Sequence, residues 1–237
     1  MAMGARGARV ILAPVPSARC AGERRRASAG TGRARSARAA VKENEEAGVG
    51  AGVRVTRAPD CVLLSNDNGA YTVRGEMTLA GVDAASVYNL LTDYEASPRA
   101  FRAVKSAKVI ECTGDSCVAD NIYIEQECLW NFFVFGGTFP CAFEVEERDE
   151  ELRMKCSLAP GLGRGSGFLR RFEGSWAVQA LDDGQVTVEH VLMVQPKLTP
   201  PYASKIFVQQ VEQILADVVQ EIERWDAPYP KPPHRAP

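Results

Sequence analysis

One stretch near the end of the chain, residues 202–225, constrains the fold more than any other. Its apolar residues recur at intervals of three, four and one, so they form a single stripe along a helix. They are Phe207, Val211, Ile214, Leu215, Val218, Ile222 and Trp225. Prolines at 200 and 201 and from 228 onward bound this helix, which would be roughly 36 Å long at about 1.5 Å per residue. So long an apolar stripe needs a broad apolar surface, which we expect a β-sheet to supply.

The chain from residue 53 to the helix has the pattern of an antiparallel sheet. Alternation predicts a half-buried strand near 71–79, and Asp83 is placed to cap a helix that ends at Leu91. Pro98 begins a second short helical turn that carries Phe101. Further strands are predicted near 105–112, 117–130, 139–147, 152–158, 169–181 and 186–195. The predicted order is one strand, two short helices, about six antiparallel strands and the long helix.

The first forty residues differ in composition from the rest. Residues 1–42 carry a net charge of about +9 and residues 43–237 about −11. An Arg-rich, acid-poor N-terminus is typical of an organellar transit peptide, and the alternative is a disordered basic tail. We assign 1–42 to a disordered transit peptide, 43–54 to a linker, 55–226 to the folded domain and 227–237 to a proline-rich disordered tail. The predicted compartment is the chloroplast, with the mitochondrion as the alternative.

Composition also excludes several classes of partner. The acidic body argues against nucleic acid, which requires a basic face to displace counterions from phosphates. No window holds the roughly 18 uncharged apolar residues of a membrane span. The seven cysteines form no CxxC pair, and with two histidines they indicate no zinc site. We expect no metal, no cofactor and a monomeric domain.

Cys112 and Cys117 flank a four-residue turn and can face each other across a predicted hairpin. In a plastid this geometry would allow a redox-switched disulfide. An odd number of cysteines at irregular spacing in a non-secretory compartment favours reduced thiols instead. We therefore expect two reduced cysteines here.

The residues also resemble a known family. The run VYNLLTDYE from Val87, followed by Pro98, Phe101 and VKSAKV from Val104, resembles the opening of the polyketide cyclase/dehydrase and lipid-transport family. This family belongs to the START-like (SRPBCC) superfamily, which includes coenzyme-Q-binding proteins. The run FEGSW from Phe172 is similar to the family's F-x-G-x-W strand, and the resemblance covers residues 55–225. One departure is Arg102-Ala103, where the family usually has an apolar residue and a second proline.

The resemblance implies an α+β helix-grip fold, in which a curved antiparallel sheet of about six to seven strands wraps around the C-terminal helix. It also implies a cavity between helix and sheet for a hydrophobic ligand such as a lipid, quinone or polyketide. Some relatives are cyclases and many only bind. We expect a plastid carrier or chaperone for a lipid, quinone or related isoprenoid or pigment, with transient contact with a membrane surface. The predicted cavity wall consists of Phe101, Ile122, Ile124, Trp130, Phe143, Phe172, Val188 and Ile214, with His190 as the polar contact.

His190 alternates with valines and leucine, so it shares their buried face. The simplest interpretation is a hydrogen-bonded structural histidine. The alternative is an enzyme, an aromatase/cyclase or dehydratase in which His190 is a general base. That alternative needs a second polar group in the cavity, Asp120 or Tyr123. The sequence shows no nucleophile elbow, no paired acids and no phosphate loop.

An aromatic cluster surrounds the predicted turn after residue 130. Its members are Trp130, Phe132, Phe133, Phe135 and Phe139. These residues form either a pocket wall and membrane-contacting rim or packing beneath the sheet. A large exposed aromatic patch would favour a third function, a ligand-regulated assembly factor for photosynthetic or respiratory complexes.

Overall fold

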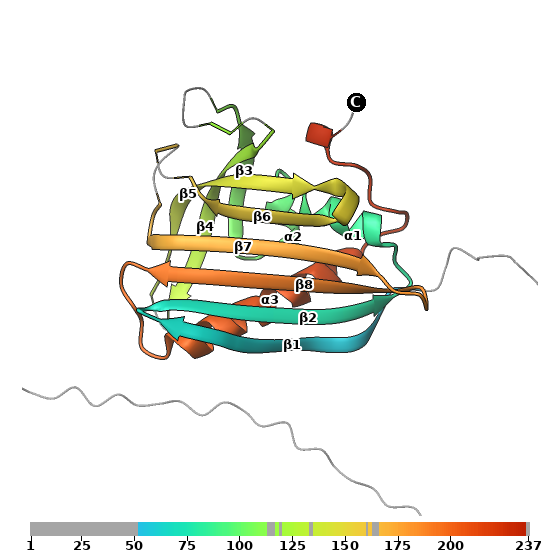
Figure 1. The fold of residues 1–237 in the computed structure, drawn as a ribbon, viewed down its shortest axis with the longest axis horizontal. Coiled ribbons are helices and arrows are strands. Elements are labelled where there is room, and N and C mark those ends of the chain that lie inside the picture. The colour runs from blue at the N-terminus through green and yellow to red at the C-terminus, as the bar shows by residue number, and fades with distance from the viewer. Residues whose placement is uncertain are drawn as a thin grey trace, which may run out of the picture. The chain divides into compact units, whose positions relative to one another are not determined.

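A computed structural model describes residues 52–112, 117–118, 120–132, 135–159, 161–162 and 166–235, with the backbone alone at 130–132 and 135. These residues form one antiparallel sheet, two short helices and one long helix (Figure 1). The elements are β1 Arg54–Asp67, β2 Ala70–Ala80, α1 Ala84–Leu91, α2 Ser97–Ala100, β3 Val104–Ile110, β4 Ile122–Phe132, β5 Phe135–Arg148, η1 Asp149–Glu151, β6 Arg153–Leu158, β7 Leu169–Ala180, β8 Gln185–Pro196, α3 Ala203–Ile222 and η2 Pro233–Arg235. None of the described helices is long and apolar enough to cross a membrane.

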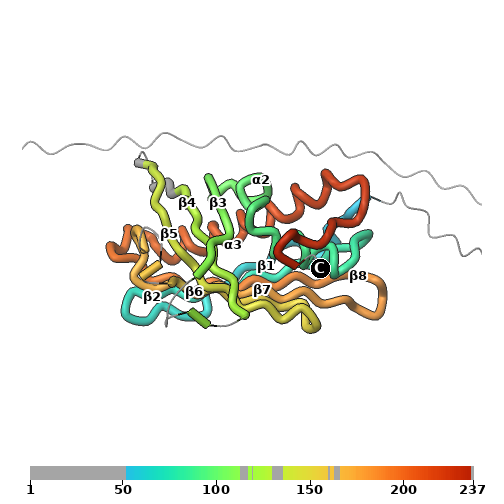
Figure 2. The backbone as a smooth tube through the Cα atoms, turned by 90° about the horizontal axis from the view of Figure 1, so that it is seen from above, coloured from blue at the N-terminus to red at the C-terminus, as the bar shows by residue number. Residues whose placement is uncertain are grey.

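The eight strands follow the order β1-β2-β8-β7-β6-β5-β4-β3, and each neighbouring pair is antiparallel. Figure 2 shows that β3, β4 and β5 turn out of the plane of the other strands, toward the layer that holds α3. The sheet therefore curves around the long helix, which confirms the expected helix-grip fold. The described residues form eight strands, where six to seven were expected.

The additional strand is β1, which the sequence analysis did not identify. Most of its residues are exposed, so it has no inside–outside alternation to read. Its pairing with β2 shifts register at three places, and each shift breaks the two-residue period. Backbone pairing to β2 along almost the whole strand defines β1, and hydrophobic patterning contributes little.

The predicted helices are present, and the long one ends at Ile222, three residues before the predicted end of its stripe at Trp225. Helix α3 lies inside the predicted stretch 202–225, and residues of the predicted stripe are buried: Phe207, Val211, Leu215, Val218 and Ile222. Helix α1 ends at Leu91 as expected. The Asp83 carboxylate accepts a 2.8 Å hydrogen bond from the backbone N–H of Ser86, which satisfies one of the free donors of the first turn.

Helix α3 lies directly on strand β2 at Gly75. A Cβ atom added to this glycine would be 2.6 Å from Cγ1 of Val211 and 2.8 Å from Cδ1 of Leu215. Real side chains do not approach so closely, so only glycine lets the helix rest at this depth. This contact sets the distance between helix and sheet, and with it the room left for a cavity beside it.

The C-terminal tail differs from the expectation of disorder at 227–237. Tyr229 is buried, its backbone N–H donates to Oγ of Ser86 at 3.1 Å, and its hydroxyl donates to Oδ2 of Asp93 at 2.9 Å. The Arg235 guanidinium donates to Asp149 at 2.9 Å and lies over the Tyr88 ring at 4.9 Å. The prediction is therefore wrong for the described residues up to 235. The prolines end α3, but they do not prevent a tyrosine and an arginine from packing on the domain.

Cys112 and Cys117 form a disulfide, with their Cα atoms 5.8 Å apart. The expectation of two reduced cysteines is therefore wrong in this structure. Strands β3 and β4 pair through Ile110 and Tyr123, which brings Cys112, just after β3, within reach of Cys117, just before β4. The disulfide closes the end of that hairpin.

We expect reduction of this disulfide to lower the free energy of unfolding by about 2 kcal/mol, because a closed short loop restricts the unfolded chain. Urea denaturation with and without dithiothreitol measures the difference. A variant with serine at both Cys112 and Cys117 is the control, and its stability should not depend on the reductant. Equal midpoints for the oxidised and reduced wild-type chain would contradict the prediction.

Candidate functional site

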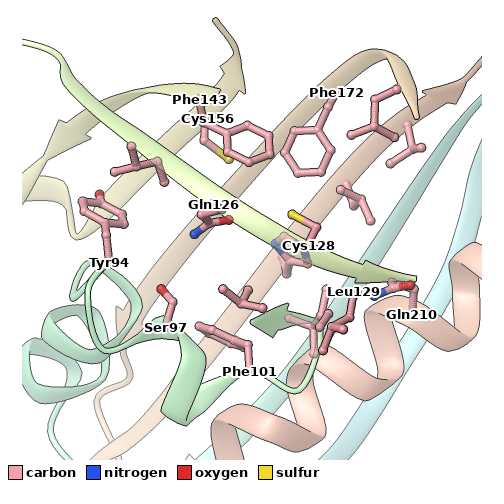
Figure 3. Close-up of a pocket in the computed structure, with 18 of the residues that line it drawn as sticks. Tyr94, Ser97, Phe101, Gln126, Cys128, Leu129, Phe143, Cys156, Phe172 and Gln210 are labelled. Atoms are coloured by element: carbon pink, nitrogen blue, oxygen red, sulfur yellow. The ribbon is translucent and has the colours of Figure 1, made fainter. Parts of the chain in front are cut away.

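A cavity of about 240 Å³ lies between the sheet and α3. Its wall comes from the segment between α1 and β3, from strands β4 to β8 and from α3. Figure 3 shows side chains from these elements pointing toward one space, with Phe143 and Phe172 on one side and Ser97 and Phe101 on the other. Side chains alternate between the two faces of a strand, so every second residue points to the concave face. This alternation places the rings of Phe143 and Phe172 on the cavity wall.

The lining residues that the structure describes include no Asp, Glu, Lys or Arg. Polar groups are few: Tyr94, Ser97, Gln126, His190 and Gln210, together with the thiols of Cys128 and Cys156. Tyr94 already hydrogen-bonds to Glu147. Burial of a charge without a partner is costly, so this wall favours a neutral ligand. Nor do the described residues contain a group of three or more His, Cys, Asp and Glu placed to hold a metal ion.

Most of the predicted wall residues lie on this cavity: Phe101, Ile124, Phe143, Phe172, His190 and Ile214. Ile122 lies instead beside a second hollow, next to the Cys112–Cys117 disulfide. Val188 is fully buried in the core and does not reach the cavity. The side chain of Trp130, like most of the predicted aromatic cluster, is outside the described residues. Phe139 is the described member of that cluster, and it lines the cavity. Ligand contact stays a prediction for all of them.

Among the wall residues that sequence reasoning missed, Trp176 and Gln210 are two that spacing could have identified. Trp176 lies four residues after Phe172 on β7, so both side chains point to the same face of the strand. Gln210 lies four residues before Ile214 on α3, which is one helical turn. The FEGSW run and the apolar stripe of the helix therefore already contained both positions.

His190 is held rigidly in the wall. Its Nδ1 lies 3.0 Å from the backbone oxygen of Ser175, and its ring stacks on Trp176 with the ring centroids 4.1 Å apart. Burial lowers its pKa to about 4, and the hydrogen bond to Ser175 opposes that shift. The imidazole is therefore neutral at pH 7. Its Nε2 is buried and has no hydrogen-bond partner among the described residues.

The two side chains proposed to assist His190 in an enzyme do not meet it. Asp120 is exposed, with a left-handed backbone φ of 71°, at the turn before β4. Tyr123 lies on the other face of β4, where its hydroxyl donates to Glu144 at 3.1 Å and accepts from the Val118 N–H at 2.8 Å. Since a backbone carbonyl also binds His190, the described cavity wall contains no acid–base pair.

Helix α2 and the segment between it and β3 border the cavity and are held to α3 by ion pairs. Arg102 donates from Nε to Oδ1 of Asp217 at 2.6 Å and from its backbone N–H to Oδ2 at 3.1 Å. One turn further along α3, the Glu221 carboxylate lies 2.9 Å from Nε of Arg99. Both acids are buried in α3. Arg102, the departure from the family pattern, therefore has a structural role in this chain.

Comparison with known proteins places this fold in a family. The sequence model described as polyketide cyclase / dehydrase and lipid transport matches residues 81–219, more than half of the chain. No curated protein matches the sequence.

Solved structures share the fold at low sequence identity. A protein of Thermus thermophilus aligns with a TM-score of 0.50 and 18% identity, over 64% of this chain and 96% of its own. A START superfamily protein of Mycobacterium smegmatis aligns with a TM-score of 0.51 and 15% identity, over 65% and 97%. The Zhui aromatase/cyclase of a Streptomyces species aligns with a TM-score of 0.48 and 12% identity, over 65% and 94%. With its sequence match and its helix-grip fold, the chain belongs to the polyketide cyclase/dehydrase and lipid-transport family.

Proposed function

We propose that this protein binds a neutral hydrophobic small molecule between the sheet and α3 and carries it without converting it. The observation that supports this most is the cavity wall, which is rich in rings and has no charged side chain among its described residues. A carrier requires only shape and apolar surface, whereas a cyclase or dehydratase requires a positioned acid and base. A lipid, a quinone and a related isoprenoid or pigment all fit this description.

The cavity volume supports a compact binding site. About 240 Å³ is slightly below the roughly 300–1,000 Å³ that is usual for drug-sized ligands. The wall reaches the surface at Leu129, which is 39% exposed and lies with Gln210 at the same end of the cavity (Figure 3). A ring or a short chain would occupy the interior, and the rest of a longer ligand would leave past these residues.

We further propose that ligand pickup occurs at a membrane surface in a plastid. Leu198 and Tyr202, in the connection from β8 to α3, are 71% and 77% exposed. Side chains of this size in contact with solvent favour a membrane or partner surface. The neighbouring Pro196 and Phe207 line the cavity, so the exposed pair lies close to it in the sequence. The Arg-rich, acid-poor residues 1–42 support import into an organelle.

The test is to fill the cavity. We expect Ile214→Trp to weaken binding of the neutral fluorescent probe N-phenyl-1-naphthylamine by at least about tenfold, because the larger indole occupies the space of the ligand. Ala216→Trp is the matched control, since Ala216 lies on the exposed face of the same helix, and its affinity should equal that of the wild type. Fluorescence titration measures both variants, and circular dichroism checks their folding.

Native mass spectrometry of the purified chain, with extraction and identification of co-purified molecules, then defines the ligand class. Two results would contradict the proposed function. One is a wild-type protein that carries nothing and does not bind the probe. The other is equal binding by the wild type and Ile214→Trp.

A further inference from the structure

We propose that the cavity selects ligands that carry a hydroxyl or N–H hydrogen-bond donor at their buried end, and that Nε2 of His190 accepts this hydrogen bond. This inference rests on the proposed function, since it assigns the chemistry of one end of the bound molecule. The ligand class is then an alcohol, a phenol or an N–H heterocycle on a neutral apolar body. A ketone, an ether or an oxidised quinone of the same shape would be disfavoured.

The first step is the tautomer of His190. Its Nδ1 lies 3.0 Å from the backbone oxygen of Ser175, and a carbonyl oxygen can only accept. Nδ1 therefore carries the proton. In a neutral imidazole the other nitrogen, Nε2, is then an acceptor with a bare lone pair. Burial, which lowers the pKa of this residue to about 4, supports the neutral form at physiological pH.

The second step is the missing partner of Nε2. His190 is 4% exposed and lines the cavity, and Nε2 is a buried atom with no hydrogen bond to any described residue. A buried polar atom without a partner costs about 1–3 kcal/mol, so such atoms are rare in folded proteins. A ligand donor at this position would recover much of that free energy.

The third step is rigidity. The ring is fixed on one edge by Ser175 and on its face by Trp176, at a centroid distance of 4.1 Å with planes 24° apart. Rotation of the imidazole toward another partner would break both contacts. Nε2 is therefore an ordered acceptor, and the wall atoms that cover it in this structure have to move aside when a ligand donor reaches it.

The fourth step is the choice between a ligand group that donates a hydrogen bond to Nε2 and one that can only accept. A ligand carbonyl or ether oxygen would place its lone pairs against the lone pair of Nε2, with no proton between them. The Tyr94 hydroxyl, which also lines the cavity, is already bonded to Glu147. A hydroxyl group satisfies Nε2, whereas an oxygen without hydrogen leaves it unsatisfied and adds repulsion.

The experiment compares 2-naphthol with 2-methoxynaphthalene, which share one ring system and differ in the donor. Calorimetric titration, or displacement of N-phenyl-1-naphthylamine, gives the ratio of their dissociation constants. We expect His190→Phe, which retains a ring to stack on Trp176, to reduce the preference for the naphthol about tenfold relative to the wild type. Tyr123→Phe is the control, because it removes a hydroxyl from the other face of β4, away from the cavity, and it should keep the wild-type preference.

A second measurement does not depend on the folding of a His190 variant. Imidazole ¹⁵N spectra of the wild-type chain should show His190 protonated at Nδ1, with the Nε2 signal moving on addition of the naphthol but not of the ether. The chain has two histidines, and a His234→Gln variant assigns the signals.

The failures of the two proposals are distinguishable. Equal preference in the wild type and His190→Phe, or an Nε2 signal that neither compound moves although both bind, would refute donor recognition while the carrier function stands. If the wild type binds neither compound nor the probe, the carrier function falls and this inference falls with it.

Discussion

The Gly75→Val chain is expected to unfold with a free energy about 3 kcal/mol lower than that of the wild type. The first added carbon would be 2.6 Å from Val211 and 2.8 Å from Leu215, with Sγ of Cys61 on the neighbouring strand β1 at 3.0 Å. Val211 and Leu215 are completely buried, so neither can move away into solvent. Helix α3 must therefore lift from the sheet, which exposes its apolar stripe and distorts the cavity that it covers.

Urea denaturation followed by circular dichroism measures this loss. Thr72→Val is the matched control, because it introduces the same side chain into the same strand on the opposite face, and it should lie within about 0.5 kcal/mol of the wild type. A Gly75→Val chain as stable as the wild type would mean that α3 does not rest on β2 at this depth.

Lowering the pH from 7.5 to 5 is expected to cost the wild-type chain about 2 kcal/mol more than the His190→Gln chain. The pKa of His190 is about 4 when folded, against the ordinary value of 6.5 that it regains on unfolding. Between these values the unfolded state binds more protons, so stability rises with pH. The contribution is fully present above pH 6.5 and is lost as the pH falls toward 4. Glutamine keeps a polar side chain that does not titrate, so the His190→Gln chain lacks the pH-dependent contribution of His190 to the free energy of unfolding.

The other titratable groups of the cavity wall do not interfere with this measurement. Burial raises the pKa of Tyr94 and that of Cys156, to about 12 for the cysteine, and the pKa of Cys128 is also raised, chiefly by its hydrogen bond with Cys141. All three stay neutral across the acidic range. Carboxylates elsewhere titrate in both chains and cancel in the comparison. Parallel stability curves for the two chains between pH 7.5 and 5 would contradict the burial of a neutral His190.

The sequence was sufficient to predict the fold where residue periodicity reflects burial. The stripe on α3 and the cap at Asp83 predict real elements, since each depends on local spacing. Strand β1 escaped prediction because backbone pairing, and not burial, defines it. The tail at Tyr229 escaped because its partner Ser86 lies 143 residues earlier in the chain. The Cys112–Cys117 disulfide was not predicted because the cysteine count and the expected compartment outweighed the hairpin geometry, which already placed the two residues opposite each other.

The same distinction applies to the cavity. Alternation placed Ile124 and Phe143 on its wall, and these two residues are paired across β4 and β5. Alternation could not tell where the cavity ends, so Ile122 was included although it lies beside another hollow. The state of His190 depends on the Ser175 oxygen of the neighbouring strand and on the Trp176 ring, and neither is visible from the position of a histidine in the sequence.

Helix α3 has two separate sets of residues, and this separation has an evolutionary consequence. Phe207, Gln210 and Ile214 face the cavity, whereas Asp217 and Glu221, nearer its C-terminus, fasten the helix to Arg102 and Arg99. Substitutions in the first set change the shape of the cavity and leave the anchoring ion pairs in place. A lineage could therefore exchange one ligand for another through a few neutral steps without passing through an unstable intermediate.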